Sequence, residues 1–296
     1  MGEILRVLIV GASGFIGSDL SRSTPDDIEL VGTFSSTQID SHGFEVRRLD
    51  LLDRDLDWNE ELNGFDCVII AARPAGHDRD SRSKIGKETH DVFAAMIEAV
   101  RGLPVKPHLV ALHGSLSYGD CGENLVSIGD KINPVGFAES YSIGEKPIRD
   151  YCESGGKCAV IRAPWVLGGG SWYQAMYALP DKIPILRSGS QWMSIITVEA
   201  LSQFIWDCVK KERVGVLHPP LSYRCRQRDF AKLISDVSGN KITNLGWLGM
   251  LRFEPQMRDS VLASIRLDDG REYSSEEESK RVQLENYIKR IHTGFS

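Results

Sequence analysis

The sequence predicts an α/β fold: a doubly wound parallel sheet with helices on both faces, and a smaller C-terminal α+β lobe. Two observations predict it. Short continuous apolar runs, typical of strands buried on both faces of a sheet, alternate with segments of helical period. The first of these runs also ends in a glycine-rich turn that leads directly into a helix. Strands that alternate with helices form right-handed βαβ units, and such units build a doubly wound sheet.

The predicted strands of the first half share a run of apolar residues bounded by glycine or polar residues. They lie at residues 6–10, 29–34, 44–49, 67–72, 108–113 and 158–163. Helices are expected between them, at residues 14–21, 85–100 and 134–153. In the second of these helices Phe93, Met96 and Val100 fall on one apolar stripe, which is typical of a crossover helix that packs on a sheet.

Beyond Pro164 the pattern loosens, and a run of three glycines at residues 168–170 breaks it. Further helices are predicted at residues 198–210 and 228–237, and a last one begins at Ser274 and Ser275 and ends with Lys289 and Arg290. Hydroxyls at the start and bases at the end suit the dipole of that last helix.

Charge and composition exclude several classes of protein. A net charge of -6 argues against a nucleic-acid surface, which requires a basic stripe. No apolar run approaches the roughly 20 residues of a membrane span, and no signal-peptide pattern opens the chain. The six cysteines form no CxxC pair, so neither a metal site nor a disulfide framework is expected. We therefore expect a reduced, cytoplasmic protein.

The glycine-rich turn is the strongest functional motif, and it reads Gly11-Ala12-Ser13-Gly14-Phe15-Ile16-Gly17. Gly11 permits a tight turn, Gly14 lets the backbone approach a pyrophosphate, and Gly17 lets the helix pack on the strand. Unpaired N–H groups at the start of a helix, together with the helix dipole, bind a diphosphate. The turn therefore predicts a nicotinamide dinucleotide site in a Rossmann-type domain; a purely structural turn is the alternative.

The predicted organisation follows from these elements. A dinucleotide-binding Rossmann core is expected over residues 1–165, with return segments at about residues 195–218. A smaller substrate-binding lobe is expected over residues 166–296, interleaved with the core.

With its GxxGxxG spacing, the chain resembles the extended short-chain dehydrogenase/reductase family, also called the NAD-dependent epimerase/dehydratase family. Further segments match in order over about residues 6–239, namely residues 49–53, 71–72, 115–119, 161–168 and 188–201. The resemblance implies that Asp50 and Leu51 contact adenine. It also implies that Ala71 and Ala72 approach the cofactor.

The choice between NAD and NADP depends on the end of the second strand. An acidic residue there would bind the ribose hydroxyls and repel a 2′-phosphate. This sequence has Ser35 and Ser36 instead, with Arg73 as a candidate cation, and this favours NADP over NAD. The alternative is that the two serines simply start a solvated loop.

The resemblance implies that a Tyr exchanges a proton with the substrate while hydride moves to or from nicotinamide. A Lys four residues later lowers the pKa of that Tyr and holds the ribose. Tyr141 lies on the expected helix, but Glu145 follows four residues later and Lys146 five. One extra residue rotates a helical side chain by about 100°. Lys146 can therefore serve only if the backbone shifts.

The hydroxyl that the family places after the fifth strand is also altered. Gly114 stands at its position, and Ser115 is the nearest replacement. His113 ends the strand, where side chains face the ligand crevice of this architecture, and its ordinary pKa suits proton transfer. A hydrogen-bonded structural histidine is the alternative interpretation.

Five residues are expected to line the mouth of the site: Tyr118, Trp165, Arg187, Gln191 and Trp192. Arg187 could pair with an anionic substrate group such as a nucleotide diphosphate, or lie solvated on the surface. Trp192 could equally be packing within the lobe.

Three functions stay open at this point. The first is an NAD(P)-dependent oxidoreductase or epimerase that uses Tyr141 on a small polar carbonyl or alcohol, with a nucleotide sugar as one candidate. The second is a dinucleotide-binding redox sensor without chemistry, consistent with Gly114 and Glu145 at the family's catalytic positions. The third is a subunit that has kept the fold for interaction. The resemblance further implies a homodimer formed through the helices of residues 85–100 and 134–153.

Overall fold

The computed structural model describes residues 4–39, 43–53, 55–271 and 277–293. Backbone contacts divide the chain into two compact units that interleave along the sequence. Unit 1 comprises residues 1–113, 139–162 and 201–217, and unit 2 comprises residues 114–138, 163–200 and 218–296. Contacts alone do not report which part binds which ligand, so the predicted division into core and substrate lobe stays a prediction.

Unit 1 is built on a seven-stranded parallel sheet with the strand order β3-β2-β1-β4-β5-β7-β11. Its strands are β1 (Leu5–Val10), β2 (Ile28–Phe34), β3 (Glu45–Arg48), β4 (Cys67–Ile70), β5 (His108–Gly114), β7 (Cys158–Ala163) and β11 (Gly215–Leu217). The order reverses between β1 and β4, and a crevice for ligands opens at such a switch point. The six predicted strands are confirmed. Sequence reasoning missed β11, because three residues are too few to show a period.

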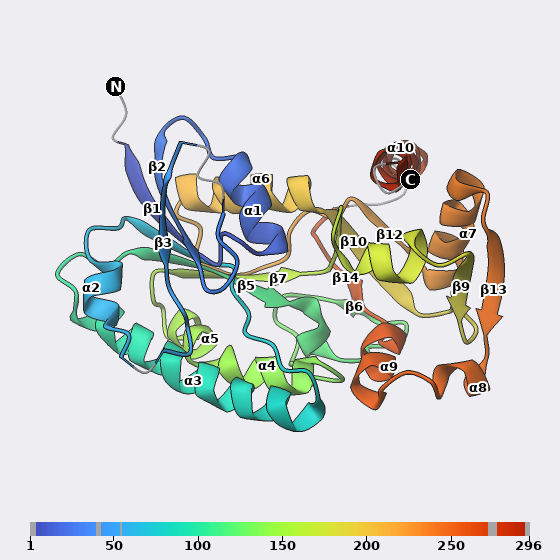
Figure 1. The fold of residues 1–296 in the computed structure, drawn as a ribbon, viewed down its shortest axis with the longest axis horizontal. Helices are drawn as coiled ribbons and strands as arrows, with labels where there is room; N and C mark the ends of the chain where they lie inside the picture. The colour runs from blue at the N-terminus through green and yellow to red at the C-terminus, as the bar shows by residue number, and fades with distance from the viewer. Residues whose placement is uncertain (1–3, 40–42, 54, 272–276, 294–296) are drawn as a thin grey trace. The chain divides into compact units, whose positions relative to one another are not determined.

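Helices cover both faces of this sheet (Figure 1). One face carries α1 (Phe15–Arg22) and α6 (Val198–Lys210), and the other carries α2 (Trp58–Leu62), α3 (Arg79–Gly102) and α5 (Lys146–Glu153). The predicted doubly wound α/β fold is therefore confirmed.

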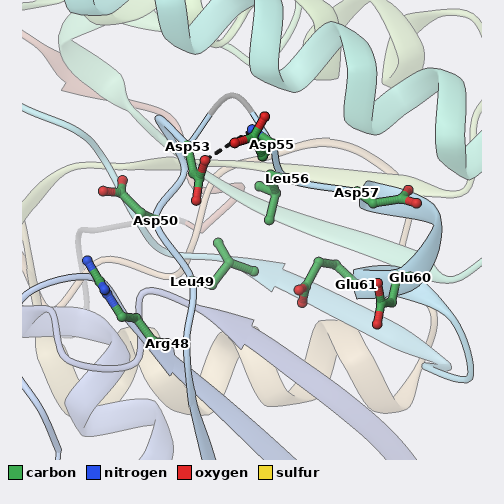
Figure 2. A pocket seen from close by; sticks show the side chains of 9 residues that line it. All are labelled: Arg48, Leu49, Asp50, Asp53, Asp55, Leu56, Asp57, Glu60 and Glu61. Atoms are coloured by element: carbon green, nitrogen blue, oxygen red, sulfur yellow. Dashed lines mark hydrogen bonds between the residues drawn. The ribbon is translucent and has the colours of Figure 1, made fainter.

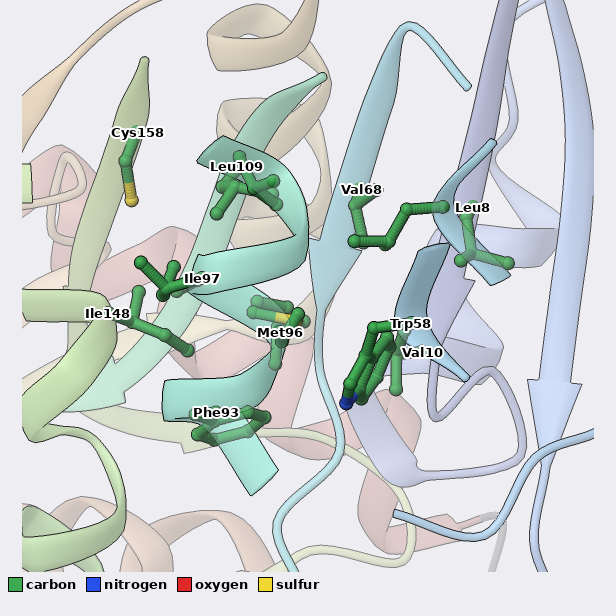
Figure 3. Packing of buried hydrophobic residues seen from close by; sticks show 14 of the residues in the cluster. Leu8, Val10, Trp58, Val68, Phe93, Met96, Ile97, Leu109, Ile148 and Cys158 are labelled. Carbon is green, nitrogen blue, oxygen red and sulfur yellow. The ribbon is translucent and has the colours of Figure 1, made fainter. Parts of the chain in front are cut away.

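A continuous apolar core lies between the sheet and the α3 face. Leu8, Val68 and Leu109 project from neighbouring strands toward Met96 of α3 and Ile148 of α5 (Figure 3). All five side chains are fully buried. The carboxyl ends of these strands lead into the glycine loop, into the segment of Arg73 and into His113.

The helix expected at residues 134–153 is two helices, and this corrects the prediction. Residues 134–137 are not helical, and α4 (Ala138–Gly144) is followed by α5, which has Pro147 in its first turn. Proline has no N–H to donate to the preceding turn, so a continuous helical ladder cannot run through it. Glu145 lies at the junction between the two helices.

Unit 2 combines small sheets and short helices, as expected of an α+β lobe. Its strands form three sheets: β12 (Tyr223–Arg226), β10 (Trp192–Thr197) and β8 (Trp165–Leu167); β13 (Lys241–Leu245) and β9 (Lys182–Leu186); β14 (Arg266–Leu267) and β6 (Leu125–Val126). Its α-helices are α7 (Gln227–Ser238), α8 (Trp247–Met250), α9 (Pro255–Leu262) and α10 (Glu277–Thr293). The helices predicted at residues 198–210 and 228–237 and near the C-terminus are confirmed. The predicted cap residues of the last one, Ser274 and Ser275, lie outside the described residues.

In residues 4–39, 43–53, 55–271 and 277–293, none of the helices has the length and apolar character needed to cross a bilayer. The same ranges contain no group of three or more His, Cys, Asp or Glu side chains arranged to hold a metal ion.

Candidate functional site

The glycine loop of unit 1 has a geometry that only glycine permits. Gly11 has a φ of +92°, and a Cβ added there would lie 2.7 Å from the backbone nitrogen of Ala72. A Cβ on Gly17 would lie 2.1 Å from the carbonyl oxygen of Gly11. These contacts are far below van der Waals distance, so the close turn and the approach of α1 to the loop both depend on missing side chains.

The loop presents backbone donors at the start of α1. Gly14 donates its N–H to the carbonyl of Gly11 at 3.0 Å and forms the N-cap of the helix, without a side-chain cap. Gly11 in turn donates to the Thr33 hydroxyl at 3.0 Å, which ties the loop to β2. Ser13, Phe15 and Ile16 are not buried, unlike Ala12. A cradle of this kind fits the diphosphate of a dinucleotide.

Ser35 and Ser36, which the sequence places near the ribose of the cofactor, lie exposed directly after β2. Arg48, the last residue of β3, pairs with Phe34 in the sheet and donates its Nε to the carbonyl of Ser35 at 3.3 Å. Sequence reasoning missed Arg48. Its position at the end of the predicted third strand was a signal for it, because a third strand that pairs with the second brings the carboxyl ends of both strands together.

The segment after β3 borders a cavity of 410 Å³ (Figure 2). The acidic side chains that line the cavity are Asp50, Asp53, Asp55, Asp57, Glu60 and Glu61, and the other ones are Arg48, Leu49 and Leu56. Asp50 accepts a hydrogen bond from the N–H of Leu52 at 3.0 Å, and Leu51 is buried in the core. This acidic lining repels a phosphate group. The diphosphate is therefore expected at the glycine loop and not in this cavity.

Tyr141 lies on α4, and the residue one helical turn later is Glu145, whose N–H donates to the Tyr141 carbonyl at 3.0 Å. Lys146 has a half-exposed side chain that forms an ion pair with Asp150 along α5. The structure places Arg73 against Tyr141, with the guanidinium carbon 4.1 Å from the centroid of the phenol ring. Arg73 comes from the segment after β4.

Glu145 is the buried centre of a charge cluster that also includes the half-exposed Arg73. Its carboxylate lies 3.5 Å from Nη2 of Arg73, 3.7 Å from Nη1 of Arg162 and 3.5 Å from Nδ1 of His113. Glu145 is 5% exposed and Arg162 2% exposed. A carboxylate so far from water requires close positive charges, and the two guanidinium groups supply them.

His113 is neutral in this cluster. Burial lowers its pKa well below the ordinary value of 6.5, and the positive charges of Arg162, Arg73 and Arg149 lower it further. The contact with Glu145 is therefore between a carboxylate and an uncharged imidazole. This differs from the near-neutral pKa expected from the sequence, and a base of such low pKa accepts protons poorly at neutral pH.

Two glycines let α3 and α4 approach closely and so place Tyr141. A Cβ on Gly86 would lie 2.4 Å from the carbonyl oxygen of Ser140, and a Cβ on Gly144 would lie 2.9 Å from Cβ of Thr89. The backbone of α4 is thus pressed onto α3 on both sides of Tyr141. Periodicity alone could not show this, because both glycines fall inside helical segments.

The other predicted site residues belong to unit 2. Ser115 is buried at the start of a 3₁₀ turn (Ser115–Tyr118). Tyr118 is also buried, and its hydroxyl lies 2.8 Å from Nε2 of His218. His218 places its Nδ1 2.6 Å from the carbonyl oxygen of Asp268, so this Nδ1 carries the proton and Tyr118 donates to Nε2.

Trp192 is held between charged groups of unit 2. The guanidinium carbons of Arg226 and Arg266 lie 3.9 Å and 4.7 Å from its ring centroid, and its indole N–H donates to Glu123 at 3.1 Å. Gln191 beside it is buried and donates its amide to the carbonyl of Val261 at 3.3 Å. These contacts pack both residues within unit 2.

The remaining predicted lining residues, Trp165 and Arg187, have different surroundings. Trp165 packs edge-on against Trp172, with ring centroids 4.7 Å apart. Arg187 is exposed, has a φ of +56° and lies over the ring of Trp247. A positive φ at a non-glycine residue is uncommon, and it marks a tightly constrained turn before β10.

The family of the chain follows from a match over most of its length. Residues 7–216 match the model of the NAD dependent epimerase/dehydratase family. The chain belongs to this family. The resemblance expected from the glycine spacing is thereby confirmed. No curated protein matches the chain.

Solved structures of the same fold cover essentially the whole chain. The UDP-N-acetylglucosamine 4-epimerase of Methanobrevibacter ruminantium, in complex with UDP-N-acetylmuramic acid, has a TM-score of 0.75 and 17% identity, and the match covers 100% of this chain and 99% of that one. The human epimerase family protein SDR39U1 with NADPH has a TM-score of 0.74 and 17% identity, with 98% and 99% covered. The UDP-glucuronic acid 4-epimerase of Bacillus cereus with NAD gives a TM-score of 0.73 at 17% identity, with 98% and 99% covered. Identity this low shows the fold alone.

Proposed function

We propose that the chain is an NADP-dependent oxidoreductase or epimerase that acts on a small polar carbonyl or alcohol, with Tyr141 as the proton-transferring phenol. One observation carries the proposal. Ala72 lies against Gly11 of the glycine loop, and the next residue, Arg73, stacks on the ring of Tyr141. Neighbouring α-carbons are 3.8 Å apart, so two consecutive residues join the dinucleotide cradle to the phenol.

The bound nicotinamide would supply or accept hydride. The chain's own residues do the rest. The backbone of the glycine loop binds the diphosphate, and Tyr141 gives a proton to, or takes one from, the substrate oxygen. Ser115 is proposed as the hydroxyl that orients the same oxygen, because it is the nearest replacement for the family's hydroxyl. Lys146 would need to leave Asp150 to take part.

NADP is the proposed cofactor because three groups at the ribose end suit a 2′-phosphate. The hydroxyls of Ser35 and Ser36 are exposed, and the guanidinium of Arg48 lies beside them. A guanidinium binds phosphate strongly and in a fixed geometry. NADPH of the human neighbour supports this preference, whereas NAD in the Bacillus neighbour supports the alternative.

Replacing Arg48 with Gln tests the cofactor preference. We expect Arg48→Gln to weaken NADPH binding about tenfold, the loss of one charged hydrogen bond, and to leave NADH binding nearly unchanged. Titration calorimetry with both cofactors measures this. Arg101→Gln, which removes an exposed arginine from α3, is the matched control. An equal loss for both cofactors would contradict the assignment of Arg48 to the phosphate.

A nucleotide sugar is the proposed substrate class. Two structural neighbours bind UDP-sugars, and this is the support for the class. Arg187 is the proposed partner of the diphosphate, since it is exposed and positively charged. Tyr118, Trp165, Gln191 and Trp192 are proposed to shape the substrate pocket through the packing described for unit 2.

Replacing Tyr141 with Phe tests the chemistry. We expect Tyr141→Phe to lower turnover by 100-fold or more across a panel of nucleotide sugars and simple carbonyls, because general acid–base catalysis contributes about 10²–10⁴-fold. Affinity for NADPH should stay within about twofold of wild type, since the diphosphate binds elsewhere. Turnover is followed by the absorbance of reduced nicotinamide. A folded variant with unchanged turnover would remove Tyr141 from the mechanism.

The second candidate is a dinucleotide-binding redox sensor. Gly114 and Glu145 favour it, because both stand where the family has catalytic groups. Tight cofactor binding without turnover on the whole panel would support it, and turnover on any substrate would end it. For either function we also propose a cytoplasmic homodimer. The six free cysteines suit a reducing compartment, and light scattering tests the dimer.

A further inference from the structure

We propose that Arg73 is a positioning residue that stabilises the phenolate form of Tyr141, and that Glu145 holds Arg73 in place. The inference rests on the proposed function of Tyr141, because it says how that phenol is made acidic enough to exchange a proton. It assigns this electrostatic role to a residue of the segment after β4, which the sequence pattern offered only as a partner of the cofactor phosphate.

The first step is the position of the charge. The guanidinium carbon of Arg73 lies 4.1 Å from the centroid of the Tyr141 ring, within the range of a cation–π contact. A phenolate spreads its negative charge into the ring, so a cation over the ring interacts more strongly with the phenolate than with the phenol. An opposite charge at this distance favours the ionised form.

The second step is what holds the guanidinium there. Nη2 of Arg73 lies 3.5 Å from Oε1 of Glu145, which follows Tyr141 by one helical turn. Glu145 is buried and is also close to Arg162, so its carboxylate has a fixed place. A side chain that spans the phenol ring and this carboxylate is restricted at both contacts. In addition, Ala72 is packed against Gly11, which fixes the backbone immediately before Arg73.

The third step is the balance of charge around α4. Glu145 alone would oppose ionisation of Tyr141, because like charges one turn apart repel. Arg73 and Arg162 offset that carboxylate, and His113 is neutral. Of the other charges of this region, Glu139 lies near Arg79 of α3, Lys146 pairs with Asp150, and Arg149 lies 3.9 Å from Glu153. Arg73 stacks directly on the phenol ring.

The test is a titration of the Tyr141 phenol in the full-length protein, without substrate. Phenolate absorbs in the ultraviolet, and subtracting the curve of Tyr141→Phe isolates Tyr141 from the other tyrosines. We expect a wild-type midpoint below the ordinary phenol value of about 10, and an Arg73→Gln midpoint about one pH unit higher. Glu145→Gln should shift the midpoint less, because it loosens Arg73 and also removes an opposing charge.

Two further variants complete the design. Arg73→Lys keeps the charge and should restore most of the wild-type midpoint, whereas a purely structural role of the guanidinium would leave this variant as altered as Arg73→Gln. Arg79→Gln removes a neighbouring arginine that does not contact the ring, and its midpoint should equal that of wild type. In turnover assays the basic limb of the pH profile should move with the phenol midpoint.

Three results would overturn the inference. The first is a wild-type midpoint at or above about 10, obtained by subtracting the curve of a Tyr141→Phe protein that is folded by circular dichroism. The second is an Arg73→Gln protein, folded by circular dichroism, with an unchanged midpoint. The third is a Lys146→Gln midpoint shifted as far as that of Arg73→Gln. Absence of turnover on every substrate would instead refute the proposed function and leave the titration interpretable.

Discussion

The glycine loop and the junction of α4 with α5 are built by opposite means. The loop is made of backbone: a positive φ at Gly11, a Cβ-free approach at Gly17 and N–H groups at the start of α1. The junction is made of side chains, with Glu145 gathering Arg73, Arg162 and His113 from three other segments.

The difference determines how each region tolerates divergence. A backbone cradle requires glycine at fixed spacing, since any side chain would occupy the space of the loop or of the ligand. A charge cluster requires only that opposite charges lie close together, so a charged residue of one segment can replace a charged residue of another.

The largest effect on cofactor binding is expected at the loop, from Gly17→Ala. A methyl group 2.1 Å from the Gly11 carbonyl oxygen forces the loop and α1 apart. We expect NADPH affinity to fall by at least about 100-fold, roughly 3 kcal/mol, because the diphosphate loses its backbone donors. Calorimetric titration measures this. In Gly102→Ala, where no atom lies within 4 Å of the added Cβ, affinity should stay as in wild type. Normal binding by Gly17→Ala would show that the cradle does not hold the diphosphate.

Glu145→Lys tests the junction by restoring the residue type of the family. It removes the carboxylate beside Arg162 and adds a third cation in a buried place. We expect the free energy of unfolding to fall by about 3–5 kcal/mol, and by less for Glu145→Gln, which adds no charge. Urea denaturation measures both. Wild-type stability of Glu145→Lys would mean that charge balance does not define this junction.

The smallest effect is expected from His113, through pH. Its pKa is lowered in the folded protein, so the imidazole stays neutral there while the unfolded chain binds a proton below about pH 6.5. Stability from this group is therefore full above that pH and is lost as pH falls toward the folded pKa. His113→Asn should lose about 1 kcal/mol less than wild type between pH 7 and pH 5.5 in urea denaturation. Parallel curves for the two proteins would show that His113 titrates alike in both states.

Much of the fold could be predicted, because each strand of the sheet carries its own local signal. Continuous apolar runs bounded by glycine or polar residues predicted six strands of the parallel sheet. The seventh strand, β11, was not predicted because it has only three residues. The single helix predicted at residues 134–153 is in fact two shorter helices. The helical spacing of apolar residues continues across Pro147, but the backbone hydrogen bonds of a helix cannot, because proline has no N–H.

The candidate site was predictable only in part, for a related reason. The glycine loop is contiguous, so its spacing alone indicated a dinucleotide. Arg48 was missed because it reaches Ser35 only through the pairing of β3 with β2. The sequence offered Arg73 as a candidate cation for the cofactor phosphate. Its stacking on Tyr141 could not be predicted, because it depends on where β4 ends relative to α4.

The sequence by itself determined the α/β class, the order of the strands along the chain and the glycine spacing of the loop after β1. Each depends on residues that are neighbours in the chain, where sterics and apolar period act locally. Only the tertiary structure decided that Lys146 pairs with Asp150, that Glu145 is buried, and that Arg73 stacks on Tyr141. Electrostatic partners act through space, and folding brings together charges that are 72 residues apart in the case of Arg73 and Glu145 (145 minus 73).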